Sequence, residues 1–512
     1  MPKPNVLIIH CDQLRHDWLG YAGHPTIRTP HIDKLAAAGR VFTNHWVSNP
    51  VCQPSRASLF TGLHACGHGL WSNGTNLPRR THEPGPLDAL RAEGNDSLER
   101  QPPTLGDVFG AAGYKTFAIG KVHFEPLLAP EEHGFMESYS AWHGDPDRDW
   151  TGPYYGMDHV EISIGHAEKG LVSTGHYGKW IRERDPELVR KIQDDPPSGP
   201  HQVYPGPIPH KLHNTTWIAE RTAAMFDSLE DDQPFLGFLG IPGPHHPFSP
   251  SFDILEKFAA WRDPGTQDDE GAFCRDSGFE RFHEDPQPPQ VDLREEPKEL
   301  LATARRNTAA MIWQIDDAVG KILAALEKSG RRENTYVLFT SDHGDFLGNH
   351  GGLLFKHMMG CADLLRVPFV LSGPGITGGW HDEDVMSNTD VLPTLCALTG
   401  VTPPGLVHGR DRSQPGSGED HRAYAFSYNA INNGANFRLD NFSVMDGRYR
   451  VTLYPRTEDG FAEIYDLHAD PWETRNLRDD PALQELRAER TREIEQTLFA
   501  SAMPGRTRQM IF

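Results

Sequence analysis

The segment from Cys52 to Gly62 reads C-Q-P-S-R-A-S-L-F-T-G and carries a cysteine and an arginine four positions apart. Pro54 suits the first turn of a helix and Gly62 suits its end, so the segment predicts a helix with Cys52 at its N-terminus. Free N–H groups and the helix dipole favour negative charge there, and Arg56 adds a fixed cation. Such a setting lowers a thiol pKa and binds tetrahedral anions. The ordinary alternative is a small buried cysteine beside a surface arginine.

Two further segments carry carboxylates. Asp12 is followed by Gln13, and Asp342 is followed by His343 in S-D-H-G-D. Two carboxylates and one imidazole suit a hard divalent cation such as Ca²⁺, Mg²⁺ or Mn²⁺. Gln13 is neutral and offers only an amide oxygen or hydrogen bonds. The alternative is that the aspartates cap following helices, but their association with histidine and a candidate nucleophile favours a metal site.

Lysines and histidines form a third group of candidates. Lys121 and His123 are two positions apart, so in extended chain both side chains point the same way. His245 lies in the proline-rich loop P-G-P-H-H-P-F, where an extended chain would turn His246 elsewhere. Lys356 ends the segment H-G-G-L-L-F-K. Any one of these would ordinarily be a surface or packing residue, and only a shared location gives them a common role.

The elements that must bring these residues together are short apolar runs. Continuous runs at 6–9, 117–119, 235–239 and 336–339 predict strands buried on both faces of a parallel sheet. Most of the candidate residues follow directly after one of these runs. Ligands of open α/β sheets gather at the carboxyl ends of the strands. The sequence therefore predicts one composite site assembled from segments more than 300 residues apart.

Composition limits the partners. Lysine and arginine number 49 against 71 aspartates and glutamates, a net charge of −22 that argues against nucleic acid and against an anionic membrane surface. A local cationic site can still bind an anionic substrate. Six cysteines without C-x-x-C spacing predict neither a disulfide framework nor a zinc knuckle. The sequence shows no signal-peptide core and no membrane-length apolar stretch, so we expect a cytoplasmic protein.

The segment 52–62 resembles the C-x-P-S-R-x-S-x-x-T-G signature of the sulfatases, within the alkaline-phosphatase-like superfamily. Blocks at 5–13, 120–124, 244–248, 341–345 and 463–477 resemble further family blocks in family order. The resemblance implies that a formylglycine-generating enzyme oxidises Cys52 to Cα-formylglycine. It also implies that one divalent metal ion is held by Asp12, Cys52, Asp342 and His343. The catalytic residues it implies are Cys52, Arg56, Lys121, His123, His245 and Lys356.

Gln13 stands where many sulfatases carry a second aspartate, and this places the resemblance closest to the choline sulfatase and phosphonate monoester hydrolase branch. We therefore expect a sulfuric ester hydrolase, aryl- or alkylsulfatase-like, that cleaves small sulfate monoesters. The alternative is a phosphonate monoester or phosphodiester hydrolase with the same active site, as a main or promiscuous activity. A third interpretation is an inactive binding protein. Asn73, like Gln13, is a candidate contact around the substrate.

Other cysteine chemistries fit less well. A protein-tyrosine-phosphatase loop needs cysteine and arginine six positions apart, whereas Cys52 and Arg56 are four apart. A papain-like or Ser-His-Asp hydrolase would leave the acidic cluster at 342–345 without a role.

For the fold we expect a large, mixed, mostly parallel sheet sandwiched by helices, with a small C-terminal α+β subdomain. The expected domains are 1–402 and 403–512, divided near a Pro-Pro-Gly turn. Two Pro-, Asp- and Gly-rich stretches, near 143–215 and 262–298, predict long insertions that act as lids, interaction surfaces or disordered segments. The tail 505–512 ends in apolar residues after basic ones, which suits docking on a neighbouring subunit, although fraying is the default for a terminus. We expect a homo-oligomer.

Overall fold

An eight-stranded sheet lies at the centre of the computed structural model, which describes residues 2–78, 102–265, 274–278, 291–292, 298–356, 359–416, 421–428 and 440–501. The strands run in the order β11-β2-β10-β8-β1-β6-β4-β5. All neighbouring pairs are parallel except those of β10, which is antiparallel to both β8 and β2. Their bounds are β1 (Asn5–Asp12), β2 (Arg40–Phe42), β4 (Lys115–Gly120), β5 (His159–Ile162), β6 (Phe235–Pro244), β8 (Thr335–Ser341), β10 (Phe369–Ser372) and β11 (Trp380–Asp382). The predicted mixed, mostly parallel sheet is confirmed.

The four predicted strands are the middle of this sheet. Every residue of β1, β6 and β8 is buried, as expected for strands covered on both faces. Alternate side chains of β1 enter different cores: Leu7 and Ile9 pack in one, Val6 and Ile8 in the other. Because β1 pairs with β6 on one side and β8 on the other, its end lies between theirs.

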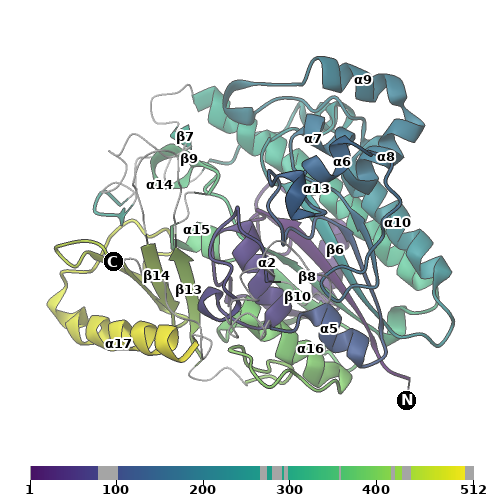
Figure 1. Cartoon of the computed structure of the whole chain (residues 1–512). Coiled ribbons are helices and arrows are strands. Elements are labelled where there is room, and N and C mark those ends of the chain that lie inside the picture. The colour runs from purple at the N-terminus through teal and green to yellow at the C-terminus, as the bar shows by residue number, and fades with distance from the viewer. Residues whose placement is uncertain are drawn as a thin grey trace.

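Helices cover both faces of the sheet (Figure 1). One core contains residues of α1 (Pro30–Ala37), α8 (Gly175–Arg184), α10 (Asn214–Ser228) and α13 (Lys298–Lys328). The other contains residues of α2 (Cys52–Thr61), α5 (Leu105–Ala111) and α16 (Val391–Thr399). The predicted helical sandwich is therefore confirmed, and α2 with Cys52 lies on one face of the sheet, near the ends of its central strands.

The stretch 143–215 is not the irregular insertion that its composition predicts. It contains β5, which extends the main sheet, and the segments α7 (Glu168–Ser173), α8, α9 (Pro186–Asp194), η3 (Pro200–Gln202) and η4 (His210–Leu212). Glycines and prolines divide it into pieces too short to show periodicity. Most of these pieces nevertheless bury apolar side chains, such as Ile162, Tyr177 and Val189. Of 262–298, only 262–265, 274–278, 291–292 and 298 lie in the described part of the chain.

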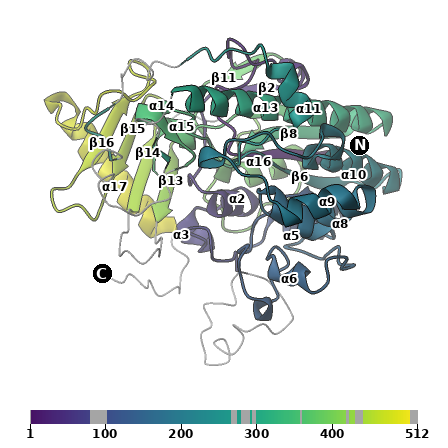
Figure 2. The same ribbon diagram turned by 90° about the horizontal axis from the view of Figure 1, so that it is seen from above.

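A four-stranded antiparallel sheet forms the predicted C-terminal α+β subdomain, seen beside the main body in Figure 2. Its strands are β13 (Ala423–Tyr428), β14 (Asp440–Met445), β15 (Tyr449–Leu453) and β16 (Ala462–Asp466). Helix α17 (Gln484–Ser501) packs on it through Ile494, which is buried with Val444, Val451 and Ile464. The tail 505–512, for which subunit docking and fraying were the two alternatives, lies outside the described residues.

Short elements connect these parts. They are β3 (His45–Trp46), β7 (Val291–Asp292), β9 (Leu353–Leu354), β12 (Met386–Ser387), α3 (Ala65–His68), α6 (Ser140–His143), α11 (Phe252–Leu255), α14 (Asn349–Gly352), α15 (Ala362–Leu365), η2 (Glu131–His133), η5 (Glu256–Phe258), η7 (Arg332–Asn334), η8 (Asn388–Asp390) and η9 (Pro481–Leu483). In the described ranges we find no helix with both the length and the apolar character needed to cross a membrane.

Candidate active site

The ends of four adjacent strands bring the candidate residues together. Asp12 is the last residue of β1 and Asp342 follows β8 directly. Lys121 follows β4, and His245 follows β6. Because the sheet order is β8-β1-β6-β4, these four residues occupy neighbouring positions along one edge, as the sequence predicted.

A compact group of metal-ligand types lies at this edge. One ligand atom from each of its members lies within 4.8 Å of the others, and all members are buried: Asp12, Cys52, Asp342 and His343. Cys52 Sγ is 3.6 Å from Asp12 Oδ1 and 3.2 Å from His343 Nε2. Two carboxylates, an imidazole and a fourth group at this spacing fit a divalent cation that prefers oxygen ligands.

Helix α2 positions the cysteine and the arginine. It begins at Cys52, as predicted, and ends at Thr61, and the left-handed conformation of the next residue, Gly62 (φ 67°), caps the helix. The Arg56 side chain is fully buried, unlike a surface charge. Its Nε donates to Asp342 Oδ2 at 2.8 Å and its second terminal nitrogen lies 3.3 Å from Asp12 Oδ2. Arg56 therefore holds both aspartates in place with one planar fork.

Two lysines approach the same centre. Lys121 forms a short ion pair with Asp12. Lys356 Nζ lies 2.8 Å from Cys52 Sγ, 2.9 Å from His245 Nε2 and 3.0 Å from His343 Nε2. The structure thus places Lys356 at the centre of the site, as the resemblance implied.

Electrostatics around Cys52 favour a negative charge. Burial and Asp12 oppose ionisation of the thiol, but Lys121, Lys356 and His343 outweigh them and lower its pKa. Burial also lowers the pKa of Lys356, yet Cys52, Asp12 and Asp342 together raise it above its usual value. The arrangement therefore keeps Lys356 charged beside Cys52.

His166 is a site residue that the sequence analysis missed. Its Nε2 lies 2.7 Å from Lys121 Nζ and 4.0 Å from Asp12 Oδ2. Its ring stacks on that of His245 with centroids 3.6 Å apart and an interplanar angle of 12°. His166 follows β5, which lies in the stretch predicted to be irregular. The signal that could have found it is the short alternation H-V-E-I-S-I at 159–164, a strand pattern that a histidine follows two residues later.

Gln13 links the metal-ligand group to its surroundings. Its backbone N–H donates to Asp342 Oδ1 at 3.0 Å, and its Nε2 donates in a short bond to Asp345. The remaining amide oxygen, Oε1, is buried and has no hydrogen-bond partner in the described part of the protein. Gln13 therefore presents an unpaired oxygen of the type that hard cations bind.

His246 does not point away from the site, contrary to the expectation for an extended chain. Its ring stacks on His245 at 4.0 Å between centroids and lies 3.9 Å from that of Phe355. Its Nδ1 is 3.1 Å from Gln13 Nε2. The chain bends at 245–247, so neighbouring side chains no longer alternate.

His123 and Asn73 hold more peripheral positions. His123 is buried with a left-handed backbone (φ 65°), so its alignment with Lys121 is not that of an extended strand. Burial, Lys121 and Arg56 hold the pKa of His123 well below its ordinary value, and its Nδ1 has no partner among the residues described. Asn73 is exposed and its Oδ1 accepts the N–H of Gln53 at 3.1 Å, so it contacts the first turn of α2.

Comparison with known families matches two regions of the chain. Residues 4–401 match the family described as Sulfatase. Residues 348–499 match the family described as N-sulphoglucosamine sulphohydrolase, C-terminal. The first match covers the four central strands, α2 and every residue of the site described above.

Individual relatives are similar over most of their length. The chain is 26% identical over 499 residues to the ulvan-active sulfatase of Formosa agariphila, covering 95% of this chain and 79% of that protein. It is 25% identical over 501 residues to the choline-sulfatase of Rhizobium meliloti, covering 94% and 83%. Among solved structures, the phosphonate monoester hydrolase of Agrobacterium radiobacter matches with a TM-score of 0.71 and 21% identity, covering 98% and 96%. The chain is a hydrolase that belongs to the sulfatase family of the alkaline-phosphatase-like superfamily.

Proposed function

We propose that the protein hydrolyses small sulfate monoesters at a formylglycine formed from Cys52, with one divalent metal ion. The observation that carries this proposal is the position of Cys52 at the N-terminus of α2. There it lies within 3.6 Å of a metal-ligating carboxylate and 2.8 Å from Lys356 Nζ. A buried residue held between a dicarboxylate cluster and lysine ammonium groups suits a nucleophile that attacks an anionic ester.

The residues of the site fit both a divalent metal ion and a formylglycine at position 52. Asp12, Asp342 and His343 would hold a Ca²⁺, Mn²⁺ or Mg²⁺ ion, and the unpaired Oε1 of Gln13 would add a neutral oxygen. The thiol of Cys52 occupies the position of the formylglycine side chain. When bound, the metal supplies Lewis-acid charge that lowers the pKa of a coordinated oxygen, and formylglycine supplies the hydroxyl nucleophile.

The chain's own side chains then divide the remaining tasks. Arg56 fixes the two aspartates, and Lys121 adds positive charge beside Asp12. Lys356 is charged, and its Nζ lies 2.9 Å from His245 Nε2. Burial lowers the pKa of His245, so its ring is neutral and accepts from Lys356. This pair can stabilise the charge on the ester oxygens and deliver a proton to the leaving alcohol, while His123 lies nearby as a neutral base.

A second candidate is the hydrolysis of phosphonate monoesters or phosphodiesters. Gln13 favours it, because a glutamine at this position is the feature in which the sequence resembles the choline sulfatase and phosphonate monoester hydrolase branch. The fold of a phosphonate monoester hydrolase is also similar to that of this chain. Sulfate monoesters and phosphonate monoesters both present one negative charge at the reacting group, so the same residues suit both.

Parallel kinetics distinguish the candidates. Purified protein, with residue 52 analysed by peptide mass spectrometry and metal content measured, is assayed with 4-nitrophenyl sulfate and 4-nitrophenyl phenylphosphonate. We expect kcat/KM to be at least ten-fold higher for the sulfate. A higher value for the phosphonate would make the second candidate the main activity. No turnover of either ester, or of an alkyl sulfate, by protein that carries formylglycine and metal would indicate a binding protein.

We also propose a cytoplasmic location and maturation by a formylglycine-generating enzyme. All six cysteines are free, which is consistent with a reducing compartment. The expected homo-oligomer stays a prediction.

A further inference from the structure

A buried glutamate, Glu137, binds the loop that carries the site residues Lys121 and His123. Its side chain is 2% exposed, and one carboxylate oxygen accepts the backbone N–H of His123 in a short bond. The other oxygen accepts the N–H of Phe124 at 2.6 Å and that of Glu125 at 3.2 Å. Three consecutive backbone donors therefore converge on one carboxylate, which is the geometry of an anion-binding nest filled by the chain itself.

The backbone of His123 depends on this carboxylate. Its left-handed conformation (φ 65°) is uncommon for a residue that carries a side chain, and such conformations persist only where the surroundings determine them. Glu137 is itself held by the Tyr154 hydroxyl, which donates to it at 2.6 Å, and by its own N–H, which donates to Glu125 at 3.3 Å. The carboxylate thus has a fixed position from which it holds the turn at His123.

Lys121, two residues earlier, is held by other groups. Its backbone N–H donates to the Gly240 carbonyl at 2.7 Å. Its carbonyl accepts from a terminal nitrogen of Arg56 at 2.9 Å. Neither bond involves Glu137, so the loss of the carboxylate would release His123 and leave the backbone of Lys121 in place.

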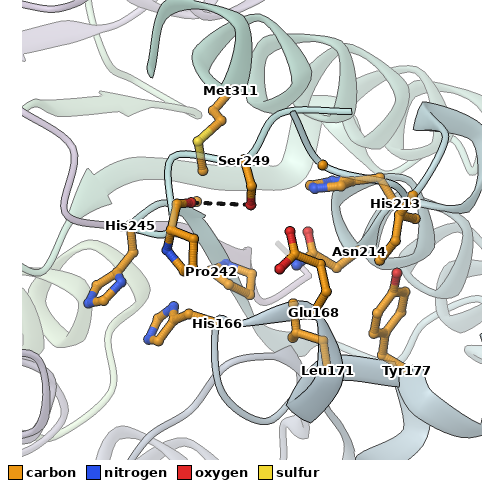
Figure 3. Close-up of a pocket in the computed structure, with 14 residues that line it drawn as sticks. His166, Glu168, Leu171, Tyr177, His213, Asn214, Pro242, His245, Ser249 and Met311 are labelled. Carbon is orange, nitrogen blue, oxygen red and sulfur yellow. Dashed lines mark hydrogen bonds between the residues drawn. The ribbon is translucent and has the colours of Figure 1, made fainter. Parts of the chain in front are cut away.

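Other histidines of the site have contacts that fix their rings. His166 and His245 stack with centroids 3.6 Å apart at the edge of a pocket (Figure 3). Nδ1 of His343 lies 2.8 Å from a backbone carbonyl oxygen. Within the residues that the structure describes, the His123 ring stacks on no other ring and its Nδ1 has no hydrogen-bond partner. The direction of this ring is therefore set mainly by its backbone, which Glu137 holds.

We propose that Glu137 is a positioning residue for the hydrolytic reaction, which holds the His123 ring where it can take up a proton. It acts through His123 rather than on the ester. The inference rests on the proposed ester hydrolysis, in which His123 is a neutral base. A catalytic base must lie within hydrogen-bond reach of the proton that it abstracts, and a displacement of about 1 Å lowers the rate by large factors.

A double-mutant cycle on the holoenzyme tests this role. The turnover number kcat is measured for the wild type, Glu137→Gln, His123→Ala and the variant with both changes. In Glu137→Gln an amide nitrogen replaces one of the two accepting oxygens, so at least one N–H of the loop faces a donor. We expect this change to lower kcat by about ten- to hundred-fold in the wild type. When residue 123 is already alanine, it should lower kcat by less than about two-fold.

Tyr154→Phe is the matched control. It removes a donor from the same carboxylate but leaves the three backbone N–H bonds in place. We expect it to change kcat by less than about two-fold. A loss in Tyr154→Phe as large as that in Glu137→Gln would show that any disturbance of the carboxylate lowers turnover, which would overturn the specific link to His123.

Losses that multiply in the variant with both changes would also overturn the role, because a general structural effect lowers turnover whether or not the His123 ring is present. An unchanged kcat in Glu137→Gln would do the same. Circular dichroism shows whether each variant folds. If Glu137→Gln does not fold, Glu137→Asp takes its place in the cycle with the same expectations, since it keeps the charge but draws the carboxylate back by one methylene.

The outcomes separate this inference from the proposed function. The cycle uses whichever ester the protein hydrolyses, so a preference for a phosphonate leaves the inference open to the same test. If no ester is hydrolysed, the proposed function fails, and amide hydrogen exchange of the segment 121–125 then decides whether Glu137 holds the loop. We expect exchange to be at least about ten-fold faster in Glu137→Gln than in the wild type, with exchange of β1 unchanged. Equal rates would overturn the inference.

Discussion

Nζ of Lys121 lies 2.7 Å from Nε2 of His166 while the same ammonium group pairs with Asp12. An ammonium group only donates, so the imidazole accepts and is neutral. Burial and the charge of Lys121 lower the pKa of His166 well below its ordinary value, which agrees with this assignment. His166 therefore fixes the position of the lysine without adding charge to the site.

Replacing His166 tests this positioning role. His166→Ala leaves the buried ammonium with one partner fewer, so we expect kcat/KM for a sulfate ester to fall by about ten- to hundred-fold. His166→Gln can still accept a hydrogen bond near Nε2 and should recover a large part of that loss. Steady-state kinetics of both variants measure the effect. Equal losses in the two variants, or none in His166→Ala, would contradict the role.

Arg56→Lys removes the planar guanidinium group that bonds to both Asp12 and Asp342. A lysine provides one compact charge and cannot bond both carboxylates in the plane that Arg56 uses. We expect the free energy of unfolding to fall by about 3–5 kcal/mol, because a buried charge network is broken. Turnover should fall at least hundred-fold. Urea unfolding followed by fluorescence measures the first effect. Arg28→Lys, at the surface, is the control and should change neither quantity.

Removal of the metal should affect activity and stability together. Without a cation, Asp12 and Asp342 lose a counter-charge in a buried site. Dialysis against a chelator is expected to abolish hydrolysis, and Ca²⁺, Mn²⁺ or Mg²⁺ should restore it. A free ion concentration of 100 times Kd should raise the free energy of unfolding by about 2.7 kcal/mol. Full activity in protein that elemental analysis shows to be metal-free would contradict the assignment, and Asp342→Asn should lose the response to added metal.

The ion pair of His350 with Asp363 predicts a pH-dependent stability. His350 precedes Lys356 by six residues, and its Nε2 lies 3.2 Å from Asp363 Oδ2. Burial opposes the protonated ring, but hydrogen bonds and charges of Asp363 and Cys361 raise the pKa of His350 well above its ordinary value. Since the folded-state pKa is raised, the contribution to stability is complete below about pH 6.5 and is lost as pH rises through the folded pKa.

Urea unfolding of the wild type and His350→Gln between pH 6 and 10 checks this. The stability difference between the two proteins should be largest near pH 6 and shrink at higher pH, by up to about 1.4 kcal/mol per unit. A difference that does not change with pH would show that His350 is neutral in the folded protein.

Gly240→Ala tests the close contact that positions Lys121. A Cβ at Gly240 would lie 1.8 Å from the Lys121 carbonyl oxygen, so β4 and β6 could not keep their spacing. We expect a loss of stability of at least about 2 kcal/mol, and lower turnover because Lys121 is displaced. Gly110→Ala is the matched control, since the nearest atoms there lie 3.9 Å away and alanine favours the helix. It should stabilise the protein slightly and leave turnover unchanged.

Sequence patterns located the central strands and the residues at their ends, because continuous apolar runs and the polar residues after them are local signals. The order of the strands in the sheet could not be predicted from these local signals. The pairing of β1 with β6 and β8 depends on contacts between segments more than 200 residues apart. Cys52 and Arg56 were identifiable from spacing, whereas the contact between Arg56 and Asp342 is a product of tertiary packing.

His166 and His246 show why part of the site could not be predicted. His166 follows a four-residue strand within a proline- and glycine-rich stretch. The composition of that stretch predicts irregular chain more strongly than a short alternation of apolar residues predicts a strand. His246 was placed by assuming an extended chain, and the bend after β6 removes that premise. In both cases the position of the side chain depends on local backbone geometry that residue types alone do not determine.

Cys52 lies far in the sequence from the residues after β8 that cover it, and this distance has a consequence while the protein is being synthesised. The folded protein leaves only 1% of Cys52 exposed, and the enclosing residues Asp342, His343 and Lys356 are made about 290 residues later. At about 5–20 residues per second, this leaves an interval of about 15–60 seconds between the two. During that interval these three residues cannot cover Cys52, so the rate of translation sets the time in which a modifying enzyme can reach the side chain before they do.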